Sequence, residues 1–140
     1  MIKISTKMRY GLRALLELAK NSSAKPVKLL NISKKQKISF KYLENIFNLL
    51  KNNNVVRSIR GPSGGYILAK KPDDLSLYDI FTAINGPLNI ADCIIYPSIC
   101  GNSSKCPANG IWNELQQKIK EYFESKTLED IMKSKEGVKV

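Results

Sequence analysis

The chain has 140 residues, and its 23 Lys and Arg against 12 Asp and Glu give a net charge of +11. This length suits one domain, or a small domain with an appendage. Histidine is absent, which excludes Ser-His-Asp and Cys-His catalysis and any His-ligated metal. No catalytic acid–base pair is evident, and no apolar run approaches the roughly 20 residues of a membrane helix. We therefore expect a cytoplasmic protein that is not an enzyme.

The charge is concentrated in the first half of the chain. Residues 1–71 hold 16 of the 23 basic side chains and two of the 12 acidic ones, whereas residues 72–140 are slightly acidic. Such a division indicates a polyanion-binding module followed by a module with another task. The alternative is a solvated, lysine-rich surface without a binding role.

Hydrophobic periodicity predicts a helical first half that ends in a hairpin. The predicted elements are helices over residues 5–20, 28–36 and 40–52 and strands over 55–59 and 66–69. Ser5 or Thr6 is expected to cap the first helix and Ser39 the third, because their side-chain oxygens accept from free backbone N–H groups. This order is typical of a winged helix-turn-helix, a mostly α fold with a small β-wing.

The second half predicts a helix over 77–85 capped by Ser76, then a loop over 91–107, a long helix over 109–125 and a last helix capped by Thr127. All three cysteines fall within the loop. The long helix carries an apolar stripe that would pack against another surface. The stripe consists of Ile111, Leu115, Ile119 and Tyr122.

The predicted recognition helix and wing carry the candidate DNA contacts. Lys41 suits a phosphate or guanine, Asn45 an adenine and Glu44 a cytosine amino group, while Arg60 suits a narrow minor groove. Two plainer interpretations stay open: Glu44 pairs with Lys41 or Lys51, and the wing is an ordinary hairpin loop. The full set of candidates is Ser5, Thr6, Lys7, Arg9, Tyr10, Ser39, Lys41, Tyr42, Glu44, Asn45, Arg57, Ser58, Arg60, Gly61, Gly64 and Gly65.

The cysteines Cys93, Cys100 and Cys106 have the spacing C-x6-C-x5-C. Soft thiolates bind iron–sulfur clusters, zinc or Cu(I), and the tight C-x2-C pairs usual for structural zinc are absent. The spacing therefore favours an iron–sulfur cluster. It is also compatible with three free cysteines, or with one disulfide and a spare thiol that senses oxidation.

Several segments together resemble the Rrf-two family of bacterial transcription regulators, which includes IscR-like, NsrR-like and CymR-like members. The segments are STKMRYG at 5–11, ISFKYLE at 38–44, VRSIRGPSGGY at 56–66, the cysteine loop and TLEDI at 127–131. The resemblance spans nearly the whole chain. It implies a homodimer that reads a pseudo-palindromic operator in double-stranded DNA. The expected division is a DNA-binding domain over 1–71, a linker helix and cluster loop over 72–108, and a dimerisation helix and C-terminal helix over 109–140.

The resemblance also implies that the three cysteines bind an iron–sulfur cluster. CymR-like members of the family lack these cysteines, so their presence in this chain is informative. The fourth ligand departs from the family. IscR-like proteins have a histidine three residues after the last cysteine, where this chain has Asn109, and NsrR-like proteins have an aspartate where it has Arg9. Weak candidates are Asn109, Asp92, Ser103 or Ser104, a backbone group, water or a small thiol, so 2Fe–2S and 4Fe–4S both stay open.

The expected function is a dimeric, sequence-specific regulator that senses redox, iron–sulfur or nitric oxide status through this cluster. The alternative is a cluster-free regulator of the same family that senses by thiol oxidation or through a protein partner.

Overall fold

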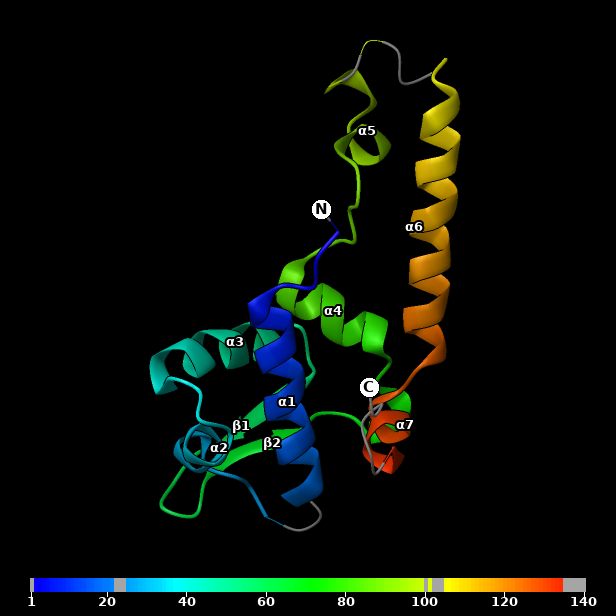
Figure 1. Cartoon of the computed structure of the whole chain (residues 1–140). Coiled ribbons are helices and arrows are strands. Elements are labelled where there is room, and N and C mark those ends of the chain that lie inside the picture. Colours follow the sequence, from blue (N-terminus) through cyan, green and yellow to red (C-terminus); the bar gives the residue numbers. More distant parts are fainter. Residues whose placement is uncertain (1, 22–24, 100, 102–104, 135–140) are drawn as a thin grey trace.

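The computed structural model describes residues 2–21, 25–99, 101 and 105–134. Its elements are α1 (Thr6–Asn21), α2 (Leu29–Gln36), α3 (Phe40–Asn52), β1 (Val56–Ile59), β2 (Gly65–Leu68), the 3₁₀ turn η1 (Pro72–Asp74), α4 (Leu77–Asn85), α5 (Asp92–Ile95), the 3₁₀ turn η2 (Pro97–Ile99), α6 (Pro107–Ser125) and α7 (Leu128–Lys133). Helices α1 to α3 and the hairpin lie at one end of the molecule, and α6 runs from there to α5 at the other end (Figure 1). The predicted fold class is confirmed.

The first three helices and the wing share one core. Leu15 of α1, Ile32 of α2 and Phe47 of α3 are all completely buried. Strands β1 and β2 pair antiparallel, and Tyr66 of β2 packs edge-on against Phe47, with ring centroids 5.0 Å apart. Two backbone hydrogen bonds of 2.9 and 2.8 Å join Tyr66 to Val27, just before α2. The wing is therefore fixed to the helices as well as to itself.

The turn between α2 and α3 is held by local hydrogen bonds. Lys37 takes a left-handed conformation with φ 54°. The buried Ser33 hydroxyl donates to the carbonyl of Ile38 at 2.6 Å. Ser39 caps α3, because its Oγ accepts from the backbone N–H of Tyr42, which confirms the predicted cap. These contacts set the angle at which α3 leaves α2.

A buried carboxylate joins α1 to α2. Glu17 is only 8% exposed, and its carboxylate lies 3.1 Å from Lys35 Nζ and accepts from the side-chain amides of Asn21 and Gln36. Burial raises the pKa of Glu17, but Lys35 and the two amides outweigh it and lower that pKa below its ordinary value. The ionised carboxylate therefore stabilises this junction.

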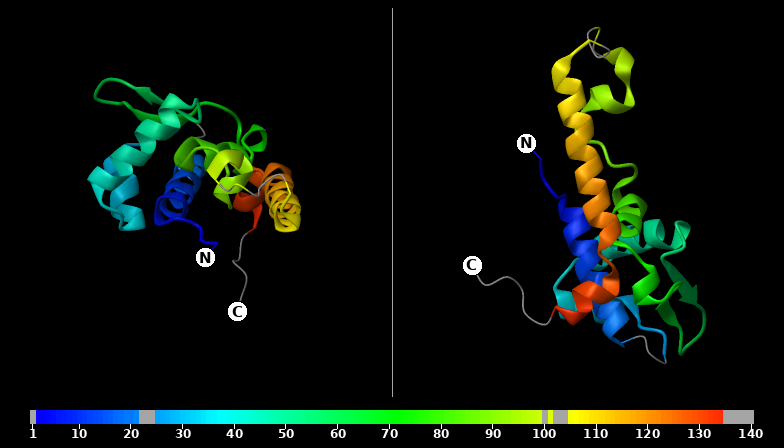
Figure 2. Two further views of the ribbon diagram at one scale, coloured as in Figure 1. Left: turned by 90° about the horizontal axis from the view of Figure 1, so that it is seen from above. Right: turned by 90° about the vertical axis from the view of Figure 1, so that its right-hand side faces the viewer.

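The second half is attached to the first through α4. This helix packs against α1 and α3 and begins with a capping box of Ser76 and Asp79. The C-terminal part of α6 crosses α4, where Phe123 contacts Phe81 at a centroid distance of 5.4 Å (Figure 2). A second capping box, of Thr127 and Asp130, starts α7 and confirms the predicted cap.

One predicted loop is partly helical. Residues 91–107 contain the single turn α5 and the 3₁₀ turn η2. Turns this short bury too little to show hydrophobic periodicity, and they are held by local bonds such as that from the N–H of Tyr96 to the carbonyl of Asp92 at 2.8 Å. Helix α6 begins at Pro107, two residues before the prediction, because proline is favoured in a first helical turn.

The three-part division of the chain stays a prediction, and the contacts of α4 with α1 and α3 cross its first boundary at residue 71. In the part of the chain that the structure describes, no helix has the length and apolar character needed to cross a membrane.

Candidate DNA-binding face and cysteine region

Helix α3 separates a buried face from a polar face. Leu43, Ile46 and Phe47 are buried, whereas Lys41 and Asn45 are exposed. The half-buried Tyr42 packs edge-on against Tyr10 of α1, with ring centroids 5.9 Å apart. The exposed side chains lie in the first two turns of α3, which is the part of a recognition helix that reaches base edges.

Glu44 lies on α3, close enough to the wing for its charge to act on Tyr66. Its Oε1 is 3.5 Å from Lys41 Nζ, so one of the two pairings weighed from the sequence is present. Burial and then the negative charge of Glu44 raise the pKa of Tyr66 in β2. Because exposed ion pairs are weak, the carboxylate is available to a base donor without a large cost.

The wing candidates fall into two groups. Arg57, Ser58, Arg60 and Gly61 are exposed, and the guanidinium of Arg57 donates to the carbonyl of Ala69 at 3.4 Å. Gly64 is buried, and its N–H donates to the carbonyl of Gly61 at 2.9 Å. The half-buried Gly65 lies against Val27. The structure therefore places Arg60 and Gly61 on the outside of the turn and Gly64 and Gly65 inside it.

The start of α1 is connected to the end of α4. The hydroxyl of Ser5 accepts from the N–H of Met8 and donates to Oδ1 of Asn85, both at 3.1 Å. The Ser5 hydroxyl thus acts as a helix cap and as a contact between elements. Thr6 and Arg9 are exposed and bonded to each other at 3.1 Å, and Lys7 is half-buried.

The two described cysteines flank the turn that precedes α6. Cys93 lies in α5 and Cys106 is the N-cap of α6, and both are half-buried free thiols. Cys100, Ser103 and Ser104 lie outside the described residues. Within the described ranges no three metal-ligating side chains gather into a site. Cys93 and Cys106 are both free, so their sulfur atoms are the right type of ligand for a thiolate-bound centre.

The two weak candidates for the fourth ligand are already hydrogen-bonded. Asp92 Oδ1 accepts from the side-chain amide of Asn89 at 2.8 Å. The side-chain amide of Asn109 donates to the carbonyl of Cys93 at 3.5 Å.

Sequence reasoning missed three amide contacts, of which that of Asn85 with Ser5 joins the two halves of the chain. Asn85 bonds Ser5, Asn113 bonds Asn109, and Oε1 of Gln116 accepts from the N–H of Ile90 at 3.0 Å. The Asn113–Asn109 pair has the i,i+4 spacing at which side chains meet on a helix, so the sequence carried a signal for it. The contacts of Asn85 and Gln116 have no such spacing rule, because their partners are 80 and 26 residues away.

A helix-turn-helix with a β-hairpin wing and an exposed basic face defines the class of winged-helix DNA-binding proteins. The model of the Rrf2 family, described as iron-dependent transcriptional regulators, matches residues 4–134. The chain belongs to the Rrf2 family. It is a transcriptional regulator with a DNA-binding winged helix and is not an enzyme, because its relatives are regulators.

The relatives match over nearly the full length. The transcriptional regulator IscR of Pectobacterium atrosepticum is 32% identical over 139 residues, which are 99% of this chain and 84% of the relative. The structure of CymR, the global cysteine regulator of B. subtilis, is 34% identical with a TM-score of 0.78 and covers 97% of this chain and 100% of that one. The T. potens IscR structure is 32% identical with a TM-score of 0.78, covering 99% and 92%.

Proposed function

We propose that this regulator is a homodimer that binds a pseudo-palindromic operator and senses redox, iron–sulfur or nitric oxide status through an iron–sulfur cluster held by Cys93, Cys100 and Cys106. One observation carries the proposal. Two free, half-buried thiols, at Cys93 in α5 and at Cys106 at the start of α6, lie at the opposite end of the molecule from the wing (Figure 1). This arrangement separates a sensing region from a DNA-reading region within one fold.

The DNA-reading part of the proposal is supported by exposure and charge. Lys41 and Asn45 are exposed in the first two turns of α3, and Arg60 is exposed at the wing. In this assignment α3 enters the major groove with Lys41, Glu44 and Asn45 toward base edges, and Arg60 enters the neighbouring minor groove. The remaining candidates at the start of α1 and on β1 contact phosphates and fix the register.

The homodimer is supported by the unpartnered surface of α6. None of its 19 residues is buried by the described part of the chain, and Ile111 and Tyr122 are each 59% exposed. An amphipathic helix of this length needs an apolar partner. A second copy supplies one with the same stripe, as a two-fold interface requires.

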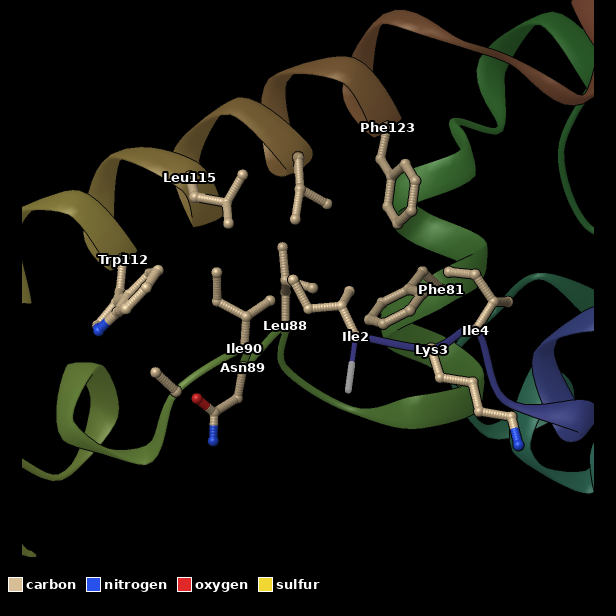
Figure 3. Close-up of a pocket in the computed structure, with 12 residues that line it drawn as sticks. Ile2, Lys3, Ile4, Phe81, Leu88, Asn89, Ile90, Trp112, Leu115 and Phe123 are labelled. Carbon is tan, nitrogen blue, oxygen red and sulfur yellow. The ribbon is translucent and has the colours of Figure 1, made fainter.

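A groove of about 470 Å³ is lined in part by Leu115 and Ile119 of this stripe. Trp112, Leu115 and Phe123 of α6 point across it toward the linker after α4 and the segment before α1 (Figure 3). Ile2 of that segment is 65% exposed. The partner's α6 would therefore cover apolar side chains from both ends of the chain.

Two connections join the cysteine region to the DNA-reading end. Helix α6 runs from Cys106 to its contact with α4. The linker from Asn85 to Asp92 is bonded to α6 through Ile90 and to α1 through Asn85 and Ser5. A change in the order of residues 91–108 would therefore shift the population of DNA-binding arrangements through packed elements.

When bound, a cluster would supply a centre that oxygen and nitric oxide attack. Thiolates are its usual ligands, and the family description as iron-dependent regulators agrees with such a centre. In this chain, Cys93 and Cys106 would hold it from α5 and from the start of α6.

Anaerobic purification with iron, sulfide and absorbance measurements tests the cluster. DNA binding of the reduced, oxidised and apo forms to a duplex selected from random sequence tests the sensing. We expect the triple cysteine-to-alanine variant to lose iron and to lose the difference between the forms. Unchanged cofactor content and DNA affinity in that variant would refute the proposal.

The second candidate is a cluster-free regulator that senses by thiol oxidation or through a protein partner. The free thiols of Cys93 and Cys106 favour it, as does the likeness to the global cysteine regulator CymR. Protein purified anaerobically without iron, whose DNA affinity changes on mild oxidation, would support this candidate.

A further inference from the structure

Asn109 lies at the point where the cysteine region joins α6. It is the third residue of α6 and is half-buried. Its side-chain amide donates to the carbonyl of Cys93 at 3.5 Å, and its backbone N–H donates to the carbonyl of Cys106 at 3.1 Å. One residue therefore contacts the backbones of the two described cysteines, which are 13 positions apart in the sequence.

The side-chain oxygen of Asn109 also makes a hydrogen bond. The side-chain amide of Asn113, one turn further along α6, donates to Asn109 Oδ1 at 2.8 Å and to the Asn109 carbonyl at 3.0 Å. The orientation of the Asn109 amide follows from this pair of contacts. The carbonyl of Cys93 only accepts, so it requires the NH₂ group, and Oδ1 is then left for the NH₂ of Asn113.

We propose that Asn109 is a positioning residue that holds the backbone of Cys93 beside Cys106, with Asn113 fixing its orientation, and that it does not coordinate iron. A neutral amide is a poor ligand for iron, and here its oxygen already accepts a hydrogen bond. This proposal rests on the proposed function only in that the cysteines it positions are the proposed ligands. The hydrogen bonds of Asn109 themselves do not require a cluster.

The apo, reduced protein provides the test, because no cluster is needed. The measurement is the alkylation rate of each cysteine with N-ethylmaleimide, followed by mass spectrometry. Hydrogen bonds shift a local equilibrium by roughly two- to tenfold, and a bond of 3.5 Å is long, so the expected factor here is about two. We expect Asn109→Ala and Asn113→Ala to raise the rate at Cys93 by about that factor and to leave Cys106 unchanged, because the bond to the Cys106 carbonyl comes from the backbone.

Gln117→Ala is the matched control. It removes an amide from the same helix, two turns beyond Asn109, where the side chain of Gln117 donates to the carboxylate of Glu121 at 3.4 Å. We expect wild-type alkylation rates for this variant. Equal rates at Cys93 in wild type, Asn109→Ala and Asn113→Ala would overturn the proposal, whether or not the wild-type protein carries iron.

Asn109→Asp separates positioning from coordination. Aspartate has the same shape but cannot donate to the carbonyl of Cys93, so positioning predicts faster alkylation of Cys93 and a less stable iron centre. Coordination predicts an unchanged alkylation rate in the apo protein and a more stable iron centre, since a carboxylate is a better iron ligand than an amide. Higher iron content in Asn109→Asp with an unchanged alkylation rate would refute the proposal. Helical circular dichroism identifies any variant that fails to fold, and Asn113→Ala then carries the test.

Discussion

Gly65 connects the wing to the helices, and its replacement by alanine gives a sharp test of that connection. Gly65 has φ +153°, and a Cβ there would lie 2.5 Å from the carbonyl oxygen of Val27 and 2.6 Å from its carbonyl carbon. Neither atom can rotate away, because both belong to the backbone. We expect the alanine to separate Tyr66 from Val27 and to break the two hydrogen bonds between them.

The expected loss in the free energy of unfolding of Gly65→Ala has two parts. A side chain in this conformation costs about 1–3 kcal/mol, and two lost backbone hydrogen bonds add about 0.5–1.5 kcal/mol each. Gly61 is the matched control, because it has φ +104° but a Cβ added there would meet no atom within 4 Å beyond its two chain neighbours. Gly61→Ala should therefore cost only the first part, and Gly65→Ala about 1–3 kcal/mol more.

Urea unfolding of both variants measures this difference in the free energy of unfolding. Hydrogen exchange provides the local check: the amides of Val27 and Tyr66 should exchange faster in Gly65→Ala and at the wild-type rate in Gly61→Ala. Surface substitutions usually change the free energy of unfolding by no more than about 0.5 kcal/mol. If the two variants differ by less than that, the hydrogen bonds between Tyr66 and Val27 contribute nothing measurable to stability.

Three further predictions concern the buried carboxylate, the DNA-binding face and the dimer. Because the folded pKa of Glu17 is lowered, its contribution to stability is present above the unfolded pKa and is lost as pH falls through the folded value. Urea titrations at several pH values should show this loss in the free energy of unfolding of the wild type but not of Glu17→Gln. Because the Lys35 side chain is 62% exposed, Lys35→Ala should lower the free energy of unfolding by about 0–1 kcal/mol. In binding assays, Arg60→Ala should weaken specific binding by about 1–3 kcal/mol, whereas Lys7→Ala should weaken all sequences alike; equal affinity of Arg60→Ala and wild type would remove the wing from the contacts. Sedimentation should show that Ile111→Arg, at a side chain left 59% exposed by the described part of its own chain, is monomeric if α6 is the dimer interface, and a wild-type dimer in that variant would contradict the assignment.

The fold was predictable from the sequence because its helices carry their own signals. Ser39, Ser76 and Thr127 all cap helices as predicted, since a cap depends on residues no more than three positions away. The boundaries of α4 agree for the same reason, whereas α2, which has no side-chain cap, begins one residue later than predicted. The helical turns of residues 92–99 were missed because a single turn buries too little to impose a period on the sequence.

The candidate site was predictable in its residue types more than in its contacts. Exposure of Lys41 and Asn45 follows from the 3.6-residue period, which places them opposite Leu43 and Phe47. The same periodicity found the stripe on α6, but a stripe has the same spacing whether its partner belongs to the same chain or to another one. Only the structure shows that Ile111 and Tyr122 are left exposed by the described part of their own chain.

The absence of histidine illustrates how one position can have two roles. Residue 109 lies one turn from Cys106, so its side chain is well placed both to reach a centre between the cysteines and to bind the backbone of Cys93. An imidazole favours the first role, because it is a strong neutral ligand. An amide favours the second, because it donates and accepts at once and so connects Cys93 to Asn113. With asparagine at this position, the contacts of residue 109 suit the positioning of the cysteine backbone that we propose.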